Sequence, residues 1–458
     1  MIGRTNTNSK LMKIAKKIGA IICCTVLATC FFIQNASSQE VISLQQAVEK
    51  TLNNNLQIKQ SQLDESLAVE NLSQSKYALY PTLNGNASAG KSFGQYRNQT
   101  TLEVTNQNST SINGGLDAGV DLFRGFQKIN QIRQNRILLD VNKTATEKVK
   151  NDLVLQVITQ YLQVLYNKDF LRAAQDQLIV SNQLLKREQA LLDAGSKTLA
   201  DISLAKSQAA TSELNVTNAN NALTISYITL AQLMDIPSSA RYEVQAPSLD
   251  KFKKMQDSID AEGLYQKALG EFPDIKLASL NTAAAAKGID IAKGNYYPSI
   301  SLGAGVQTLY SDPSRFGGTF SEQLNDNLGQ NVGLRLQIPI FNGFAARSSV
   351  RKAKINYVQS QTQEQLAKNN LNKVIYQAVA DLKGADSRYS STLNAFNAQK
   401  DAFYAVEQRY NVGLDNSLDF NTAQTNRNKA EIDFIQAKYD LLFREKVIDY
   451  YLGKPITF

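Results

Sequence analysis

The sequence of 458 residues contains no histidine and no tryptophan, and its three cysteines all lie within the first thirty residues. Without histidine, the chain cannot build a Ser-His or Cys-His catalytic pair, and it lacks the commonest transition-metal ligand of proteins. The sequence also shows no glycine-rich phosphate loop and no metal-spaced cluster of carboxylates. We therefore expect no enzyme activity, no cofactor and no metal site.

The first 38 residues have the features of a secretory signal peptide. Four lysines between Lys10 and Lys17 precede an uncharged, mostly apolar run from Ile18 to Ile33, and small residues at 36–38 suit cleavage before residue 39. The apolar run is too short for a strong membrane anchor. A lipoprotein signal with an acylated Cys30 is the alternative, although the apolar run continues past that cysteine.

Removal of this segment changes the charge of the chain. Residues 1–38 hold five basic and no acidic residues, so cleavage lowers the net charge from +8 to +3 and removes every cysteine. Nucleic-acid binding then loses its electrostatic driving force. Disulfides do not hold such a mature chain together.

Proline, glycine, aromatic and aspartate residues of the first half of the chain recur in the second half in the same order. The offset between matched residues is first 217 and then 218 positions. The matched pairs are Tyr80 with Tyr297, Pro81 with Pro298, Gly115 with Gly333, Phe123 with Phe341, Gly125 with Gly343, Phe126 with Phe344, Gly195 with Gly413 and Asp201 with Asp419. Such spacing indicates an internal duplication.

The duplication divides the chain into four segments. We predict a signal peptide over 1–38, a first repeat over 39–237, a linker over 238–259 and a second repeat over 260–458. The linker carries Lys251, Lys253 and Lys254 and is expected to be a solvated segment.

Two long stretches, 82–236 and 340–454, contain no proline and are rich in helix-forming residues. From Ala345 to Tyr410 alone, a helix would be about 100 Å long at ~1.5 Å per residue. Apolar residues recur every seven positions in the first stretch, at Val157, Val164, Leu171, Leu178, Leu185 and Leu192. This narrow seam predicts coiled-coil packing.

Four segments, 82–93, 112–123, 299–310 and 331–341, alternate between apolar and polar residues. A period of two over about ten residues is typical of a tilted membrane-spanning strand with one lipid face and one polar face. The connections 93–111 and 311–330 are long, as the outer loops of membrane barrels are.

The alternation also assigns residues to faces. Leu116, Leu122 and Leu334 are expected on the apolar face, while Asp117, Asp121 and Arg335 are expected to face a lumen, where they would tune ion passage or simply fill polar space. Tyr80, Tyr297, Phe123 and Phe341 would meet at one end of the strands as an aromatic girdle.

Four strands cannot close a membrane barrel, because unpaired strand edges are not tolerated in lipid and known barrels begin at about eight strands. Several chains must therefore contribute to one barrel. The long helices would continue the same ring and make a tube.

The order of these elements resembles the TolC family of outer-membrane efflux proteins over essentially all of residues 43–455. The matching stretches are Tyr297–Pro298, Pro339–Phe344 with Arg347 and Arg351, and Arg409–Asp419. The resemblance implies a mainly α protein with a membrane β-barrel portion. In it, a trimeric twelve-stranded barrel continues into an α-helical coiled-coil barrel, with the linker in an equatorial belt.

The resemblance also implies the function and the place of the chain. It would be a passive exit duct of a tripartite efflux or type I secretion system, in the outer membrane of a Gram-negative bacterium with a long periplasmic portion. A periplasmic adaptor and an inner-membrane pump or ABC exporter would supply the energy. The transported substrate is not indicated.

The family places its working end at the turns between the long helices. By this resemblance, Gly195, Ser196, Gly413 and Leu414 would dock the adaptor. Asp201 and Asp419 would form an acidic ring at the entrance; because the family's second acidic position is Thr422 here, the ring would be thinner or would use Asp415 instead. The other interpretation is that the glycines permit a positive φ and the aspartates cap the returning helices.

Two other classes remain open from the sequence. A secreted coiled-coil structural or adhesive protein would explain the rods but not the four amphipathic strands. A carboxylate-based hydrolase with a helical insert would need a compact acidic cleft, which the pattern does not supply.

Overall fold

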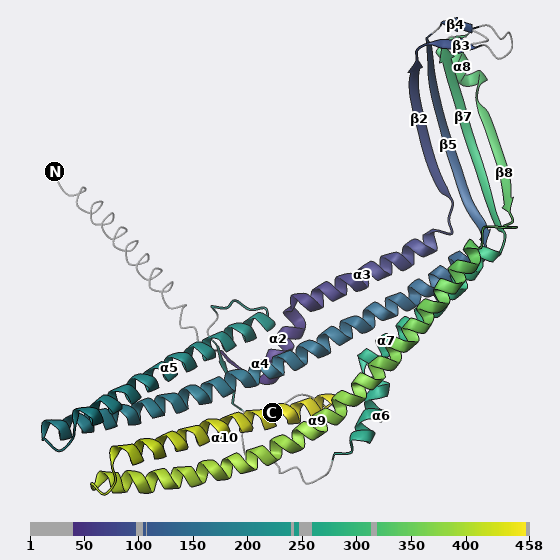
Figure 1. The fold of residues 1–458 in the computed structure, drawn as a ribbon. Coiled ribbons are helices and arrows are strands. Elements are labelled where there is room, and N and C mark those ends of the chain that lie inside the picture. Colours follow the sequence, from purple (N-terminus) through teal and green to yellow (C-terminus); the bar gives the residue numbers. More distant parts are fainter. Residues whose placement is uncertain are drawn as a thin grey trace, which may run out of the picture.

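The computed structural model describes residues 40–97, 104–106, 108–239, 242–246, 259–312 and 318–454. The expected signal peptide, Cys30 and the three linker lysines lie outside these residues. A tall sheet stands at one end of the molecule and long helices extend from it (Figure 1). In chain order the elements are β1 (Glu40–Ile42), α2 (Leu44–Asn54), α3 (Leu56–Tyr77), β2 (Thr82–Ser92), β3 (Gln95–Arg97), β4 (Val104–Asn106), β5 (Ser109–Arg124), α4 (Gln127–Asp193), α5 (Leu199–Leu233), β6 (Tyr242–Val244), α6 (Ala261–Glu271), α7 (Pro273–Lys293), the short 3-10 helix η2 (Gly294–Tyr296), β7 (Ser299–Asp312), α8 (Phe320–Asp326), β8 (Gly329–Gln337), α9 (Ala345–Asn411) and α10 (Ser417–Tyr451).

The duplication is visible in the lengths of the helices. Helices α4 and α9 each have 67 residues, and α5 and α10 each have 35. At ~1.5 Å per residue the two longest helices are each about 100 Å long, as the sequence predicts. Among the described residues, no helix combines the length and the apolar composition needed to cross a bilayer.

Both long helices begin after the same sharp turn. Gly125 and Phe126 precede α4 with φ angles of 56° and 61°, and Gly343 and Phe344 precede α9 with angles of 60° and 63°. A left-handed conformation is uncommon for a bulky residue such as phenylalanine. Its presence in both repeats indicates that this turn fixes how each strand enters its helix.

Each long helix folds back on a partner, α4 on α5 and α9 on α10. The predicted seam of α4 is only partly right: Val157 and Val164 are buried, but from Leu171 onwards the seam residues are half-buried. Apart from Leu184, the buried positions of the lower part belong to a neighbouring seven-residue series of small and polar side chains, because α4 also packs against α10. They are Asn167, Ala174, Ser181 and Glu188.

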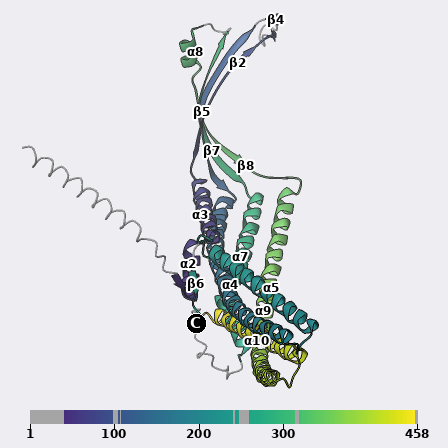
Figure 2. The same cartoon turned by 90° about the vertical axis from the view of Figure 1, so that its left-hand side faces the viewer.

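The four long strands form one antiparallel sheet in the order β2-β5-β7-β8. Its strong twist is visible in Figure 2. Strands β2 and β8 are the two edges, so the sheet is open in the single chain.

The register of this sheet separates two faces. Thr82, Gly119, Gly303 and Gly333 lie in one row across the four strands, on the face that also carries Asp117 and Arg335. The other face is apolar and bare, with rows such as Val120, Leu302 and Leu334. Its exposed large side chains are Leu83, Leu116, Leu302, Val306, Val332, Leu334 and Leu336.

Two details differ from the sequence prediction. The pairing of β5 with β7 shifts between Asp121 and Phe123, so Phe123, and not Leu122, pairs with Ile300 on the apolar face. An extra residue in a strand makes such a bulge. Strand β8 ends at Gln337 and not at residue 341, because Pro339 has no N–H to donate to a neighbouring strand.

Helix α8 covers an exposed edge near the top of the sheet. Strand β8 reaches only to the level of Gln307 on β7. Beyond it, the Asn327 side-chain amide donates to Leu309 O (2.6 Å), and Gln323 Oε1 accepts from the Ser311 N–H (3.1 Å). These side chains satisfy backbone groups that a longer strand would pair.

A small parallel sheet of β1 and β6 joins the start and the end of the first repeat at the middle of α4. The Tyr161 hydroxyl donates to the carbonyl oxygens of Ile42 (2.9 Å) and Gln245 (2.8 Å). Burial raises the pKa of Tyr161 above its usual value. Strand β6 lies within the segment 238–259 that the sequence predicts to be a linker.

Candidate functional site at the helical tips and on the polar sheet face

The turns that end α4 and α9 have the same geometry. Gly195 has a φ of 75° and Gly413 a φ of 80°, and both positions are open to solvent. Ser196 N–H donates to Leu191 O (2.8 Å), and Leu414 N–H donates to Arg409 O (2.9 Å). A glycine in this conformation closes a helix in the common C-terminal motif, so the turn role predicted for both glycines is confirmed.

The exposed side chains at these turns are largely apolar. Leu199 follows the first turn, while Val412, Leu414 and Leu418 surround the second, and each is 65–74 % exposed. Ser196 is exposed on the first turn. Exposed apolar side chains at the ends of the helical hairpins are typical of an interaction site.

Asp201 and Asp419, equivalent in sequence, make different contacts. Thr198 caps α5, and Asp201 Oδ2 accepts from the Thr198 N–H (3.0 Å) and from its hydroxyl (2.8 Å). The backbone bond to Thr198 is the main reason that the pKa of Asp201 is lowered. On α10, Asn416 provides the cap by accepting from the Asp419 N–H (2.9 Å), and the Asp419 side chain is exposed.

The third predicted gate residue, Asp415, does not present a free carboxylate in the single chain. Its side chain is 5 % exposed, and Oδ1 lies 2.5 Å from Arg409 Nη2. Among the three predicted gate residues, Asp419 therefore has the most accessible carboxylate, while Asp201 is partly engaged in the capping box of α5.

Close to the tips, a buried polar cluster joins the two repeats. Glu188 of α4 is fully buried, and one of its carboxylate oxygens accepts from the Tyr410 hydroxyl and from the Ser417 hydroxyl (3.0 Å). Lys197 donates to Ser417 Oγ (2.6 Å), and its Nζ lies 3.7 Å from the other Glu188 oxygen. Burial and the bond to Glu188 raise the pKa of Tyr410 to about 12.

Arg187 adds a second link at this level. Its guanidinium donates to the side chain of Asn411 and to the carbonyl oxygen of Tyr410 (3.0 Å), and it lies 4.5 Å from the centre of the Tyr410 ring. The sequence patterns do not predict this cluster. The signal that points to it is the seven-residue spacing of Asn167, Ala174, Ser181 and Glu188, a series of small and polar residues beside the apolar seam.

The polar face of the sheet carries a hollow of about 800 Å³ where the strands meet the helices. Gly119, Gly303 and Gly333 form the floor of this hollow, because none of these residues has a side chain to fill it. Asp117 and Arg335 border the hollow on either side of this row.

Charge on this face is only partly neutralised. Asp121 forms ion pairs with Lys128 (3.0 Å) and Arg124 (3.6 Å). Within the described parts of the chain, neither Asp117 nor Arg335 has an ion-pair partner. The structure thus brings the three predicted lumen residues to one face, two of them with free charge.

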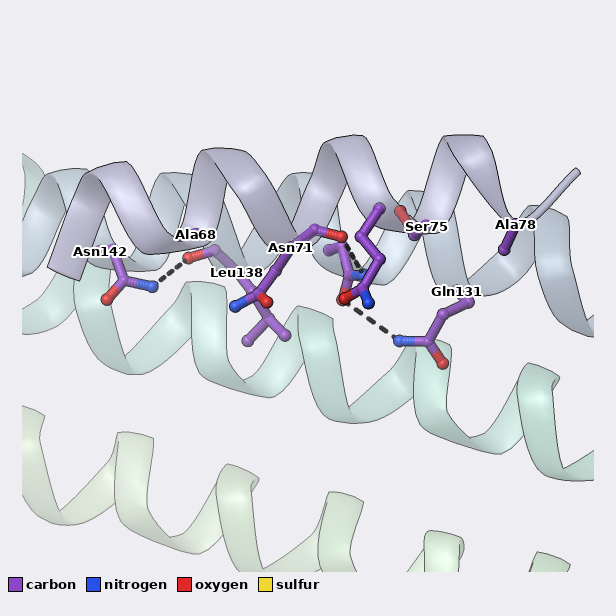
Figure 3. Close-up of a pocket in the computed structure, with 9 residues that line it drawn as sticks. Ala68, Asn71, Ser75, Ala78, Gln131, Leu138 and Asn142 are labelled. Atoms are coloured by element: carbon purple, nitrogen blue, oxygen red, sulfur yellow. Dashed lines mark hydrogen bonds between the residues drawn. The ribbon is translucent and has the colours of Figure 1, made fainter. Parts of the chain in front are cut away.

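A second hollow, of about 510 Å³, lies between α3 and α4 below the sheet (Figure 3). Amide side chains line it, and they bond to each other and to the backbone: Gln131 donates to Asn135 Oδ1 (3.1 Å), and Asn135 donates to Asn71 O (3.2 Å). No group of three or more histidine, cysteine or acidic residues suited to a metal ion occurs among the described residues.

The family model described as "Outer membrane efflux protein" matches residues 47–235 and 264–454. The outer membrane protein TolC of Escherichia coli K12 is 23 % identical over 422 residues, which are 91 % of this chain and 83 % of TolC. The cation efflux system protein CusC of the same organism is 26 % identical over 349 residues, which are 71 % of this chain and 69 % of CusC.

Among solved structures, the CmeC outer membrane channel of Campylobacter jejuni has a TM-score of 0.75 at 16 % identity, covering 90 % of this chain and 85 % of CmeC. The expected fold is thereby confirmed, and the alternative of a secreted structural or adhesive protein is not supported. The two matched segments coincide with the two repeats, and the chain belongs to the outer membrane efflux protein family.

Proposed function

We propose that three copies of this chain form one tube, the passive exit duct of a tripartite efflux or type I secretion system in the Gram-negative outer membrane. The observation that carries the proposal is a four-stranded sheet with a bare apolar face and two free edges, joined directly to helices about 100 Å long. The relatives TolC and CusC, one of them a cation efflux protein by name, support an export role.

The sheet is the membrane part of the proposed duct. Leu334 and Val332 on its apolar face are 66 % and 78 % exposed, which is costly in water and favourable against lipid acyl chains. Because backbone edges cannot face lipid unpaired, β2 and β8 need partner strands from other copies. Three copies provide twelve strands.

The opposite face would line the pore. The glycine row widens it, and Asp117, Asp121 and Arg335 would set the local charge that a passing solute meets. We propose that the pore is passive and that an inner-membrane pump or ABC exporter supplies the energy for transport.

The helical tips are the proposed docking end. The exposed apolar residues Leu199, Val412 and Leu414, beside the open turns at Gly195 and Gly413, would contact a periplasmic adaptor. Asp419, with a smaller contribution from Asp201, would place negative charge around the entrance, whereas the charge of Asp415 is compensated by Arg409.

Membrane fractionation followed by gel electrophoresis tests this function. The protein should be found in the outer-membrane fraction, and unboiled samples in SDS should migrate as a trimer that boiling converts to the monomer. A soluble periplasmic monomer that is unaffected by boiling would contradict the proposal.

A further inference from the structure

Asp117 and Arg335, two charged residues of the polar sheet face, occupy the same position in the two repeats. The hairpin of the first repeat pairs Asp117 with Asn84, and the hairpin of the second repeat pairs Arg335 with Ser301. Asn84 and Ser301 are 217 positions apart, and Asp117 and Arg335 are 218 apart, which are the two offsets of the duplication. At one equivalent point, the first repeat therefore carries a negative charge and the second a positive charge.

Both charges are accessible on the polar face. A Cβ at Gly305, the β7 partner of Asp117, would lie 3.0 Å from Asp117 Oδ1, so this carboxylate lies over a residue that has no side chain. Arg335 pairs with the small residue Ser301 and borders the hollow of about 800 Å³ from β8. Both residues are exposed, and within the described ranges no ion pair neutralises either of them.

The two charges are too far apart to neutralise each other directly. Asp117 lies in one row with Gly305 and Asn331, so Arg335 is two strands away from it and four residues further along the sheet. With ~4.8 Å between strands and ~3.3 Å per residue, the two Cα atoms are about 16 Å apart. An ion pair requires N and O within about 4 Å. Each charge is therefore available to a passing solute.

A second charged cluster on this face is confined to the first repeat. Asp121 lies between Lys128 (3.0 Å) and Arg124 (3.6 Å) and is paired with both. The equivalents of these three residues in the second repeat are all uncharged: Pro339, Ala346 and Asn342. Asp117 and Arg335 are then the free charges that the two repeats place at one level, meaning one height along the proposed pore.

We propose that Asp117 and Arg335 make a ring of alternating charge in the pore, so that this level passes cations and anions alike. The inference rests on the proposed duct of three copies, and it names the class of solute that the membrane part of the duct admits. Because equivalent strands of such a duct stand at the same height, three aspartates and three arginines alternate around its wall at this level.

The alternation determines how far the field of the wall extends into the pore. Six like charges at one level add to each other, and a pore with low-dielectric walls then concentrates counter-ions at that level. Six alternating charges cancel at the pore axis, because equal numbers of both signs lie at the same distance from it. Their field is confined to the neighbourhood of the wall. Solutes of either sign therefore pass this level without a barrier from its net charge.

Charge reversal at the two positions tests the ring. The reversal potential of the reconstituted trimer across a KCl gradient gives the ratio of K⁺ to Cl⁻ permeability. In about 10 mM salt the screening length is ~30 Å, so charges on the wall still act across the pore. Arg335→Asp places six carboxylates at one level and should raise this ratio above that of the parent, whereas Asp117→Arg should lower it. We expect a change of about tenfold in each direction.

Two control variants separate the level of the charges from their number. Asp117→Arg/Arg335→Asp contains both reversals but restores the alternation, so its permeability ratio should equal that of the parent. Asp117→Asn/Asn113→Asp keeps the composition and moves the carboxylate four residues along β5, which is about 13 Å. The two signs of charge then lie at different levels. The ratio of the currents at opposite voltages should therefore differ from that of the parent in this variant and not in the double reversal.

The neutral variants Asp117→Asn and Arg335→Gln replace the reversals if six like charges prevent assembly. Each should shift the permeability ratio in the same direction as the corresponding reversal, by a smaller factor. If the parent gives no conductance steps, the proposed duct is wrong and the ring with it. If the parent conducts but the single variants leave the ratio unchanged, the duct stands and the alternating ring is wrong. The ring is also wrong if the double reversal fails to restore the ratio of the parent, or if the displaced carboxylate leaves both measurements as in the parent.

Discussion

The hydroxyl of Tyr410 donates a hydrogen bond to the buried carboxylate of Glu188, and this bond joins α9 of the second repeat to α4 of the first. The two residues are 222 positions apart in the sequence. Because they lie just above the two turns, they hold the helical hairpins together at the end that we propose to be the entrance.

Removal of this bond should loosen the tip. A hydrogen bond to a charged group contributes about 1.5–3 kcal/mol, so Tyr410→Phe should let the hairpins separate more readily. We expect faster amide hydrogen exchange in both turns and a higher single-channel conductance, with the amount of trimer unchanged. Tyr404→Phe, an exposed position on the same helix, is the control. Equal exchange in both variants would show that the bond does not restrain the tip.

The same residue predicts an alkaline pH dependence. The pKa of Tyr410 is raised from 10.0 to about 12, so the bonded state binds this proton more tightly than the separated state does. Its stabilisation is complete below the unperturbed pKa and is lost as the pH rises through the raised one. Exchange at the turns should therefore increase between about pH 10 and pH 12 in the parent protein, and Tyr410→Phe should remove this part of the increase.

Asp419 and Asp201 should respond differently to neutralisation. Asp419→Asn removes an exposed charge, so we expect higher conductance and weaker block by multivalent cations. Asp201→Asn should leave the capping box of α5 largely intact, because an asparagine side chain can still accept from the Thr198 N–H. Because hydrogen bonds lower the pKa of Asp201, its stabilising effect is present above the unfolded pKa and is lost as the pH falls through the lowered value.

The double variant Asp201→Asn/Asp419→Asn decides between a gate and helix caps. Asparagine is nearly as good a cap as aspartate. If conductance and cation block are both unchanged in this variant, the acidic gate is refuted and Asp201 serves only in the capping box of α5.

Adjacent residues on β8 test which face meets lipid. Leu334→Arg should reduce trimer assembly, because an arginine facing the middle of the bilayer costs about 2–4 kcal/mol. Arg335→Leu should assemble normally and change conductance, because this side chain is on the polar face. The reverse pattern would place the lipid on the other face of the sheet.

Much of the fold follows from local patterns in the sequence. The absence of proline predicts the long helices, and the alternation of residues predicts the four strands and the face of Asp117, Asp121 and Arg335. Glycines at 195 and 413 mark the turns because a positive φ favours that residue. These features depend on near neighbours, which explains why one sequence reveals them.

The features that the sequence does not reveal depend on contacts between distant segments. The bulge beside Leu122 requires the pairing of β5 with β7, and the burial of Glu188 requires α10 to pack against α4. Asp415 follows Gly413 by two residues, so the sequence offers it as a substitute gate residue, but its ion pair with Arg409 forms only when the turn closes. The apolar seven-residue pattern predicts one buried face of α4. Below Val164, packing against α10 buries the adjacent face of this helix instead.

The conductance of the purified trimer in a planar lipid bilayer tests the central claim most directly. A duct lined by the polar sheet face should give discrete, long-lived ion-conducting steps, and Arg335→Leu should change their size without reducing the amount of trimer. The account would be contradicted if neither the parent trimer nor the Tyr410→Phe variant produced conductance steps.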